Sequence, residues 1–248
     1  MKSLPNTSFK LIDYPIIYKA YGSRAILMEW PPSIDEAIFE DILCMEATVL
    51  KVLEFESCIL GYHSLLIVYR DQLKSVADCI QALQQLYTTR VKRQQSAAAH
   101  WTIPTCYDQE FGFDLQTMSE DNNISIAEII SLHTAPRYRV FFIGFLPGFL
   151  YLGGLDTRLA MPRKANPSLL IPKGSVAIGG LQTGIYPSDS EGGWNVIGNT
   201  PISFFDIFKE QPCFAKAGDT LSFEPISKTA YRALEKDILA QKFQLEAQ

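Results

Sequence analysis

The sequence predicts two folded parts: an α+β N-terminal domain, with an antiparallel sheet and two helices, and a second domain made mostly of β-strands. Two observations lead to this expectation. Before about residue 90, short apolar runs alternate with two stretches whose apolar residues recur every three or four positions, as in amphipathic helices. After residue 138, short apolar runs are separated by Gly, Pro, Asn and Asp, the turn residues typical of β-rich folds.

The first half of the N-terminal domain is expected to contain two strands and a helix. Residues 16–20 and 24–30 predict strands joined by a Tyr-Gly-Ser turn, and a Pro-Pro pair ends the second strand. Ser33 and Glu36 form an S-x-x-E capping box, which predicts a helix start at Ser33. The apolar face of this helix is expected to comprise Ile34, Ile38, Ile42, Met45, Val49 and Val52.

Two more strands and a second helix complete this domain. We expect strands near 52–60 and 65–69, followed by a helix from about Asp71. The order β-β-α-β-β-α predicts one antiparallel sheet with both helices packed on it. The second helix is expected to turn inward Leu73, Val76, Ile80, Leu83 and Tyr87.

A linker is expected between the two domains. The run 93–99 is small and polar, whereas apolar patterns precede and follow it. We therefore place the α+β domain at residues 1–97 and the β-rich domain, which ends in a helix, at residues 98–248. Both lengths lie within the range of about 50–250 residues that is common for domains.

The second domain is expected to begin with a strand at 101–107 and a helix at 124–133. A second capping box, Ser125 with Glu128, predicts the start of this helix, and Pro136 predicts its end. The remaining elements are expected to be strands at 138–142, 175–178, 194–197, 202–207 and 220–224 and a last amphipathic helix at about 231–245.

Composition and charge exclude several classes of function. The net charge is −5 and the basic cluster Arg90, Lys92 and Arg93 is short, so no nucleic-acid partner is expected. No apolar run approaches the roughly 18 residues of a membrane span, and the N-terminus lacks a signal-peptide pattern. The 5 cysteines form no Cys-x-x-Cys pair and the 3 histidines share no ligand spacing. These features indicate a reduced, cytoplasmic protein without a metal site.

The common nucleotide-binding and hydrolase motifs are missing from the sequence. It contains no G-x-x-x-x-G-K-[ST] loop, no G-x-G-x-x-G and no G-x-S-x-G. A phosphate-binding loop or a serine nucleophile of these kinds is therefore not expected in this chain.

The segment 144–156, GFLPGFLYLGGLD, is apolar and rich in residues that break helices. Pro147 and the glycines rule out a regular helix, and the apolar residues do not alternate with polar ones as in a half-buried strand. We therefore expect a shaped apolar loop.

The densest functional signal is the stretch 174–194, GSVAIGGLQTGIYPSDSEGGW. Its glycines permit tight turns and close approaches. Turns of a β-barrel would explain these glycines alone, and this alternative stays open. Arg163 and Lys173 lie nearby in sequence and are either carboxylate ligands or solvated surface charges. The side chains of the stretch that suit a small polar ligand are Gln182, Tyr186, Asp189, Glu191 and Trp194.

Two interpretations are open for His133, which stands at the end of the predicted helix 124–133. A histidine there can pack in the core or cap the terminal carbonyls. It can also carry a proton at the lip of a site, because the apolar loop begins 11 residues later.

Three blocks of sequence resemble a known protein family. Residues 103–107 (IPTCY), 132–163 (LHTAPRYRVFFIGFLPGFLYLGGLDTRLAMPR) and 171–206 (IPKGSVAIGGLQTGIYPSDSEGGWNVIGNTPISFFD) are similar to the carboxyltransferase-domain, subunit-1 family. Members include the B subunit of 5-oxoprolinase, KipI-type kinase inhibitors and proteins labelled allophanate hydrolase subunit 1. The resemblance covers about residues 14–226; the chain departs from the family pattern at 108–109 and 179–182, which affects local loop shape.

The resemblance implies a C-terminal cyclophilin-like β-barrel and a role in a multi-subunit enzyme. That enzyme opens 5-oxo-L-proline to L-glutamate with ATP and needs two other subunits, of A and C type. Because this chain lacks a nucleotide motif, we expect a partner subunit to bind the ATP. The alternative is a KipI-type inhibitor that binds a sensor histidine kinase and blocks its autophosphorylation.

The matched motif positions and the residues discussed above give the expected site. The expected catalytic residues are His133, Lys173 and Gln182, with no metal. The expected substrate-binding residues are Gly148, Arg163, Tyr186, Trp194 and Asp206. These assignments require the glycine turns between positions 144 and 194 to converge in space around one concavity.

Two roles are open for the apolar loop 144–156. It either folds over the barrel rim as a pocket wall or partner contact, or plugs one barrel end as core through Phe145 and Phe149. The expected partner-contact residues are Phe145, Leu146, Pro147, Phe149 and Leu150.

Overall fold

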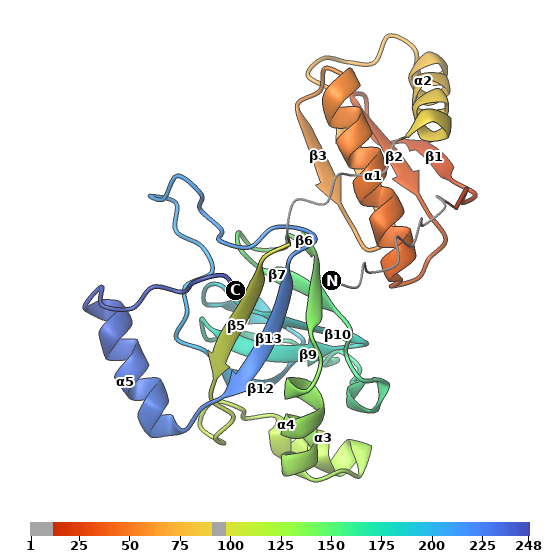
Figure 1. Cartoon of the computed structure of the whole chain (residues 1–248). Helices are drawn as coiled ribbons and strands as arrows, with labels where there is room; N and C mark the ends of the chain where they lie inside the picture. Colours follow the sequence, from red (N-terminus) through yellow and green to blue (C-terminus); the bar gives the residue numbers. More distant parts are fainter. Residues whose placement is uncertain (1–11, 91–97) are drawn as a thin grey trace, which may run out of the picture. The chain divides into compact units, whose positions relative to one another are not determined.

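The structure, a computed structural model, describes residues 12–90 and 98–248. The chain divides into two compact units, Met1–Ser96 and Ala97–Gln248 (Figure 1). Each unit has a hydrophobic core of its own. The linker expected at 93–99 lies largely outside the described residues.

The first unit is an antiparallel sheet with two helices (Figure 1). Its elements are β1 (Ile17–Ala20), β2 (Ala25–Glu29), α1 (Glu36–Val52), β3 (Ser57–Leu60), β4 (Ser64–Val68) and α2 (Val76–Thr89). The strand order is β1-β2-β4-β3, and the chain order β-β-α-β-β-α confirms the prediction. Side chains from β2, α1 and α2, among them Ile26, Ile42 and Leu83, pack together as the core.

Both helices of this unit begin later than the sequence predicted. The side chain of Asp35, not Ser33, caps α1 by accepting hydrogen bonds from two main-chain N–H groups of the first turn. Ser75 caps α2 in the same way. The S-x-x-E pattern indicates the wrong cap for α1, because Asp35 is an equally good cap and lies nearer to the first turn. Ile34 and Val52, at the ends of the predicted apolar face, are exposed, whereas its middle is buried: Ile38, Ile42, Met45 and Val49.

The second unit is a nearly closed barrel with helices around it (Figure 1). Its elements are β5 (His100–Thr105), α3 (Leu115–Asn122), α4 (Ile126–Thr134), β6 (Tyr138–Ile143), β7 (Leu150–Gly153), a 3-10 turn (Thr157–Leu159), β8 (Ser168–Ile171), β9 (Ser175–Gly179), β10 (Gln182–Ile185), β11 (Ser190–Gly192), β12 (Asn195–Asn199), β13 (Thr220–Pro225) and α5 (Lys228–Leu239). Seven strands form one mixed sheet in the order β12-β9-β10-β7-β6-β13-β5, in which β13 and β5 are parallel. Strands β8 and β11 form a separate ribbon.

Two backbone hydrogen bonds bring the edges of the seven-stranded sheet together. Cys106, directly after β5, donates its N–H to the carbonyl oxygen of Asn199 at 2.8 Å, and Asn199 N–H donates back to Cys106 at 2.9 Å. Asn199 is the last residue of β12, so the two outermost strands of the sheet meet at this point. The barrel that the family resemblance implied is therefore confirmed.

The helices of the second unit confirm one prediction, correct the bounds of another and include one helix that was not predicted. Ser125 caps α4 as expected, and this helix ends just before Pro136. The last helix begins and ends earlier than the expected range 231–245. Helix α3 is not visible in the sequence pattern, because this short helix buries only Leu115 and Met118 and shows little apolar periodicity.

One strand prediction and one loop prediction in this unit are wrong. Residues 202–207 form no strand; this segment is apolar because Ile202 and Phe204 fill the core. The predicted loop 144–156 contains the strand β7. Alternation with polar residues did not reveal β7, because apolar residues cover both of its faces.

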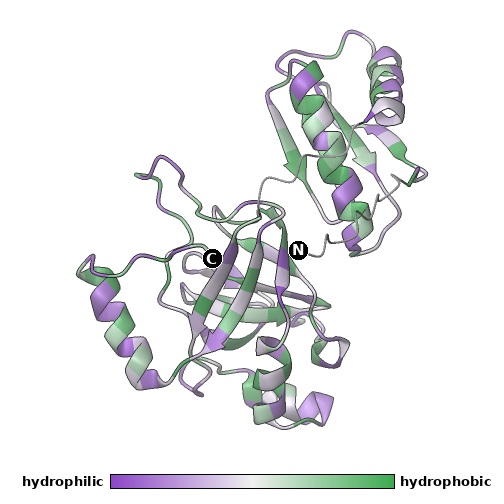
Figure 2. Ribbon diagram, viewed as in Figure 1, coloured by the Kyte–Doolittle hydropathy of each residue, from purple (hydrophilic) through white to green (hydrophobic). Residues whose placement is uncertain are grey.

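The barrel interior is the main core of the second unit. Val176, Ile178, Ile185 and Ile197 are fully buried there. Figure 2 shows the hydrophobic residues of this unit concentrated on its strands and mixed with hydrophilic ones on α5. Within the two described ranges, no helix has the length and apolar character needed to cross a membrane.

Candidate functional site

The strands that line the barrel carry a second apolar cluster on their outer face. Side chains alternate along a strand, and Thr183 and Ile185 of β10 point into the barrel. Gln182, Gly184 and the following Tyr186 therefore lie on the opposite face. We call the aromatic residues that meet there the outer-face cluster: Phe142, Phe149, Tyr151, Tyr186 and Trp194.

The rings of the outer-face cluster contact one another at favourable angles. Tyr151 stacks on Phe142, with ring centroids 4.3 Å apart. Phe149 meets Tyr186 at 5.2 Å and Trp194 at 5.4 Å, both edge to face. Such aromatic pairs stabilise a structure beyond the area they bury. The segments between 144 and 194 thus meet as a packed aromatic surface, and the single concavity that the expected site requires stays a prediction.

Two glycines make room for these rings. A Cβ atom on Gly179 would lie 2.6 Å from the indole of Trp194, and one on Gly184 would lie 2.9 Å from the ring of Phe149. Both glycines sit within strands, so they serve the close approach that the sequence analysis gave as one of two roles for the glycines of this stretch.

Polar groups border the outer-face cluster. The guanidinium carbon of Arg163 lies 5.7 Å from the ring centre of Trp194, within the range of a cation–π contact. Gln182 pairs with Gly179 in the sheet, so its side chain shares the face that holds the indole. The Oε1 atom of Gln182 is buried and accepts no hydrogen bond within the described part of the chain. A buried amide oxygen without a partner needs an explanation, and a bound donor would supply one.

The two phenols of the cluster are uncharged at neutral pH. Burial raises the pKa of Tyr186 to about 12, and it also raises the pKa of Tyr151, although the nearby Arg163 partly opposes the second shift. Both hydroxyl groups therefore keep their protons and can donate hydrogen bonds. Tyr151 and Phe142 are not among the predicted site residues; a strand predicted at β7 would have placed Tyr151 beside Gly184.

The turn between β6 and β7 separates the predicted partner-contact residues into two groups. Phe149 and Leu150 are buried, and Leu146 packs partly against the outer-face cluster. Phe145 is 65% exposed and adopts a left-handed backbone with φ of 67°. Phe145 therefore does not plug a barrel end. Pro147 is also exposed.

Gly148 holds this turn against a neighbouring segment. Its φ of 85° favours glycine, and a Cβ atom would lie 2.9 Å from the carbonyl oxygen of Phe204. Its role is thus visible as a backbone requirement, and its expected contact with substrate stays a prediction.

Three further predicted residues lie outside the aromatic contacts described above. The exposed Lys173 donates from Nζ to the hydroxyl of Ser203 at 3.3 Å. Asp206 accepts a hydrogen bond from Phe208 N–H and thereby shapes its own loop. His133 is fully buried, and burial lowers its pKa to about 3. This environment favours the packed interpretation of His133 over a proton carrier at a lip.

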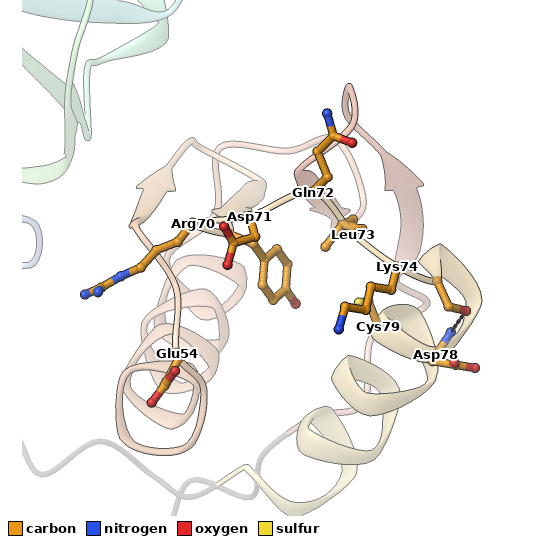
Figure 3. Close-up of a pocket in the computed structure, with 10 residues that line it drawn as sticks. Glu54, Arg70, Asp71, Gln72, Leu73, Lys74, Asp78 and Cys79 are labelled. Atoms are coloured by element: carbon orange, nitrogen blue, oxygen red, sulfur yellow. Dashed lines mark hydrogen bonds between the residues drawn. The ribbon is translucent and has the colours of Figure 1, made fainter.

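The first unit holds a pocket of about 380 Å³ that the sequence analysis did not predict (Figure 3). Its charged side chains are of both signs, so it has no clear preference for an anion or a cation. Within the described residues, no group of His, Cys, Asp or Glu could hold a metal ion. The pocket is lined by Glu54, Tyr69, Arg70, Asp71, Gln72, Leu73, Lys74, Ser75, Asp78 and Cys79.

A two-unit chain with this barrel and its aromatic outer face belongs to a recognisable class. Residues 16–215 match the family described as carboxyltransferase domain, subdomain C and D, and the chain belongs to that family.

The curated relatives specify the branch of this family. The chain is 33% identical to the B subunit of 5-oxoprolinase from Escherichia coli O157:H7, over 82% of this chain and 93% of that protein. It is 41% identical to the corresponding B subunit of Haemophilus influenzae, over 66% of this chain and 76% of that protein. The match to the B subunit of Bacillus subtilis, at 45% identity, covers 54% of this chain and spans only 56% of that relative.

Solved structures agree on the fold. The crystal structure of TTHA0988 has a TM-score of 0.71 at 27% identity, and the match covers 82% of this chain and 40% of that one. The urea amidolyase of K. lactis has a TM-score of 0.82, covering 99% of this chain and 17% of that chain. Its identity is 17%, so it supports the fold alone.

Proposed function

We propose that this chain is the B subunit of a 5-oxoprolinase, which opens 5-oxo-L-proline to L-glutamate with ATP and requires A- and C-type subunits. The observation that carries the proposal is the match to a protein of that name across 93% of its length. We further propose a cytoplasmic location and an ATP site on a partner subunit, since the chain lacks nucleotide-binding motifs.

The outer-face cluster is the proposed place for the substrate. 5-Oxoproline is a small lactam ring with one carboxylate and one amide. The guanidinium of Arg163 can bind the carboxylate through two parallel hydrogen bonds. The unpartnered Oε1 of Gln182 is the acceptor proposed for the lactam N–H, and the buried ring of Trp194 supports the guanidinium of Arg163 through their cation–π contact.

The other predicted residues take supporting roles in this proposal. Lys173 is the exposed cation among the expected catalytic residues and keeps that assignment, as does Gln182. Phe145 and Pro147 are the exposed members of the expected partner contact, and exposed apolar side chains often mark such contacts.

Co-expression with candidate A and C subunits tests the proposal. We expect glutamate to form from 5-oxoproline and ATP only when all three proteins are present. Full activity of the A and C proteins without this chain would refute the proposed role. ATP hydrolysis by the purified chain alone would contradict the placement of the nucleotide on a partner.

A further inference from the structure

His133 stands at the centre of a buried polar chain inside the barrel. Its ring lies 4.4 Å from Phe223 and 5.5 Å from Tyr138, measured between ring centroids. Nδ1 is 2.8 Å from the hydroxyl of Tyr107, and Nε2 is 2.9 Å from the hydroxyl of Thr183. The hydroxyl of Tyr138 fixes the main chain here by donating to the carbonyl of His133 at 2.8 Å.

The carbonyl of Ala177 fixes the direction of each hydrogen bond in this series, from Thr183 back to Tyr107. The Thr183 hydroxyl lies 3.1 Å from the carbonyl oxygen of Ala177, and a carbonyl can only accept. Thr183 therefore donates to Ala177, and its oxygen accepts from Nε2–H of His133. Nδ1 is then the acceptor, and the phenol of Tyr107 donates to it.

A charged ring would break this arrangement. With hydrogens on both nitrogens, His133 would offer Tyr107 a second donor in place of an acceptor, and the phenol hydrogen would lose its partner. The groups that face the ring, Tyr107, Tyr138, Thr183 and Phe223, include no carboxylate that could stabilise an imidazolium. The ring is thus neutral, with its proton on Nε2.

This series of hydrogen bonds ends at Thr183 and Ala177, directly beneath the outer-face cluster. Thr183 points inward from β10, and its neighbours Gln182 and Gly184 point outward to the cluster. Ala177 of β9 packs against residues of this cluster, in one buried group with Phe149, Tyr186 and Trp194. A displacement of Thr183 therefore moves Gln182 relative to Trp194.

We infer that His133 is a positioning residue. In its neutral Nε2–H form it accepts a hydrogen bond from Tyr107 and donates one to Thr183, which in turn donates to Ala177. These hydrogen bonds hold β10 and the amide of Gln182 in place. As far as activity is concerned, this inference rests on the proposed function; the tautomer and its effect on the cluster do not.

The tautomer is measured first, on the unmutated chain. A multiple-bond ¹⁵N–¹H correlation spectrum separates the rings of the 3 histidines, which His63→Gln and His100→Gln variants assign by loss of signals. We expect the pattern of a neutral Nε2–H ring for His133. An Nδ1–H pattern, or a charged ring at pH 6, would overturn the inference.

Variants of Thr183 test the link to the cluster. Thr183→Val removes the hydroxyl, and we expect it to mix the two tautomers of His133 and to shift the indole N–H signal of Trp194. Thr183→Ser keeps the hydroxyl and should preserve both signals. Thr105→Val is the matched control, because Thr105 is also buried in a barrel strand and donates only to Ile103 within that strand. Unchanged spectra in Thr183→Val, or equal changes in Thr105→Val, would refute the link.

The reconstituted enzyme gives the last readout. Thr183→Val is expected to raise the KM for 5-oxoproline about tenfold, as a small misplacement of a binding group does, and Thr183→Ser should restore it. Equal KM values for Thr183→Val and Thr105→Val would count against the positioning role. An unmutated complex without any activity would instead refute the proposed function, and the spectra would still decide the inference about His133.

Discussion

Trp194 shows how single residues build the proposed site. Its indole meets the edge of Phe149, leaves no room for a side chain at Gly179, and carries Arg163 above it. One residue thus joins the glycine-rich stretch to the apolar turn and to a nearby cation. At this scale, Arg163 and His133 give the clearest expectations.

Arg163 should control the affinity for the carboxylate of the substrate. A hydrogen bond to a charged group contributes about 1.5–3 kcal/mol, so Arg163→Ala is expected to raise the KM for 5-oxoproline roughly 10- to 100-fold. The matched control is Arg158→Ala, because Arg158 is exposed and already paired with Asp156 at 2.7 Å. Steady-state kinetics of the three-subunit enzyme provide the measurement, and equal KM values for both variants would contradict the proposed site.

His133 should make stability depend on pH. Burial lowers its pKa from about 6.5 in the unfolded chain to about 3. Between these values the unfolded state binds more protons, so the free energy of unfolding falls as the pH drops from 6.5 towards 3. Its share of the slope approaches about 1.4 kcal/mol per pH unit.

Urea unfolding at several pH values measures this effect. The His133→Asn variant should have a lower stability at neutral pH and a shallower loss of stability with acid than the unmutated chain. Parallel slopes for the two proteins would show that His133 does not stay neutral in the folded state.

At the scale of elements, the sequence predicts helices and half-buried strands well. The patterns of α1, α2 and α4 are visible because apolar residues recur every three or four positions, and the strands of the first unit because turn residues bound short apolar runs. Strand β7 was hidden for the opposite reason, since Tyr151 contacts the outer-face cluster while Leu150 and Leu152 fill the barrel. A strand that is buried on both faces shows no alternation of apolar and polar residues, so its sequence cannot be distinguished from that of an apolar loop.

The β6–β7 turn offers a test that separates packing from contact. Phe145 is exposed and left-handed, and asparagine tolerates that backbone, so Phe145→Asn should change the free energy of unfolding by less than about 1 kcal/mol. The fully buried Leu150 is the comparison, because Leu150→Ala should cost about 2–5 kcal/mol. Denaturant unfolding and co-purification with the partner subunits measure both effects. If Phe145→Asn leaves co-purification unchanged, the turn is not a partner contact.

At the scale of the whole molecule, the two units are stabilised in different ways. Both units have a hydrophobic core, and the first also contains a buried ion pair between Asp41 and Arg90 at 2.7 Å. Asp41 also accepts hydrogen bonds from Trp30 at 2.8 Å and Tyr87 at 2.7 Å. Arg90 in turn donates to the main chain of Ile12, so this network joins the start of the described chain to the end of α2.

Removal of Asp41 should therefore unfold the first unit easily. The Asp41→Ala variant removes the only buried carboxylate that pairs with Arg90 in the described residues and leaves the exposed Asp13 at 3.1 Å, which is expected to cost about 3–5 kcal/mol. Glu56→Ala is the control, because its ion pair with Arg24 is exposed and should contribute about 0–1 kcal/mol. The indole signal of Trp30 during urea unfolding reports on this unit, and similar midpoints for the two variants would contradict the expectation.

The site was predictable only in part, because it draws on residues from several strands. The sequence indicated Trp194, Tyr186, Gln182 and Arg163 through their glycine-rich surroundings, and the structure places these around one outer face. It could not show that Thr183 and Gln182, although adjacent, serve opposite faces of β10. Nor could it show that His133 lies inside the barrel, since helix ends look alike in sequence whether water or a core surrounds them.

The closure between Cys106 and Asn199 constrains how the second unit is made. Strand β5 comes first along this unit but pairs with β13, which ends at Pro225, so its partner is synthesised more than a hundred residues later. During synthesis, strand β5 stays unpaired until β13 has left the ribosome, so the barrel can close only after that point. Such distant pairing makes folding slow, and it gives chaperones a long interval in which to bind β5.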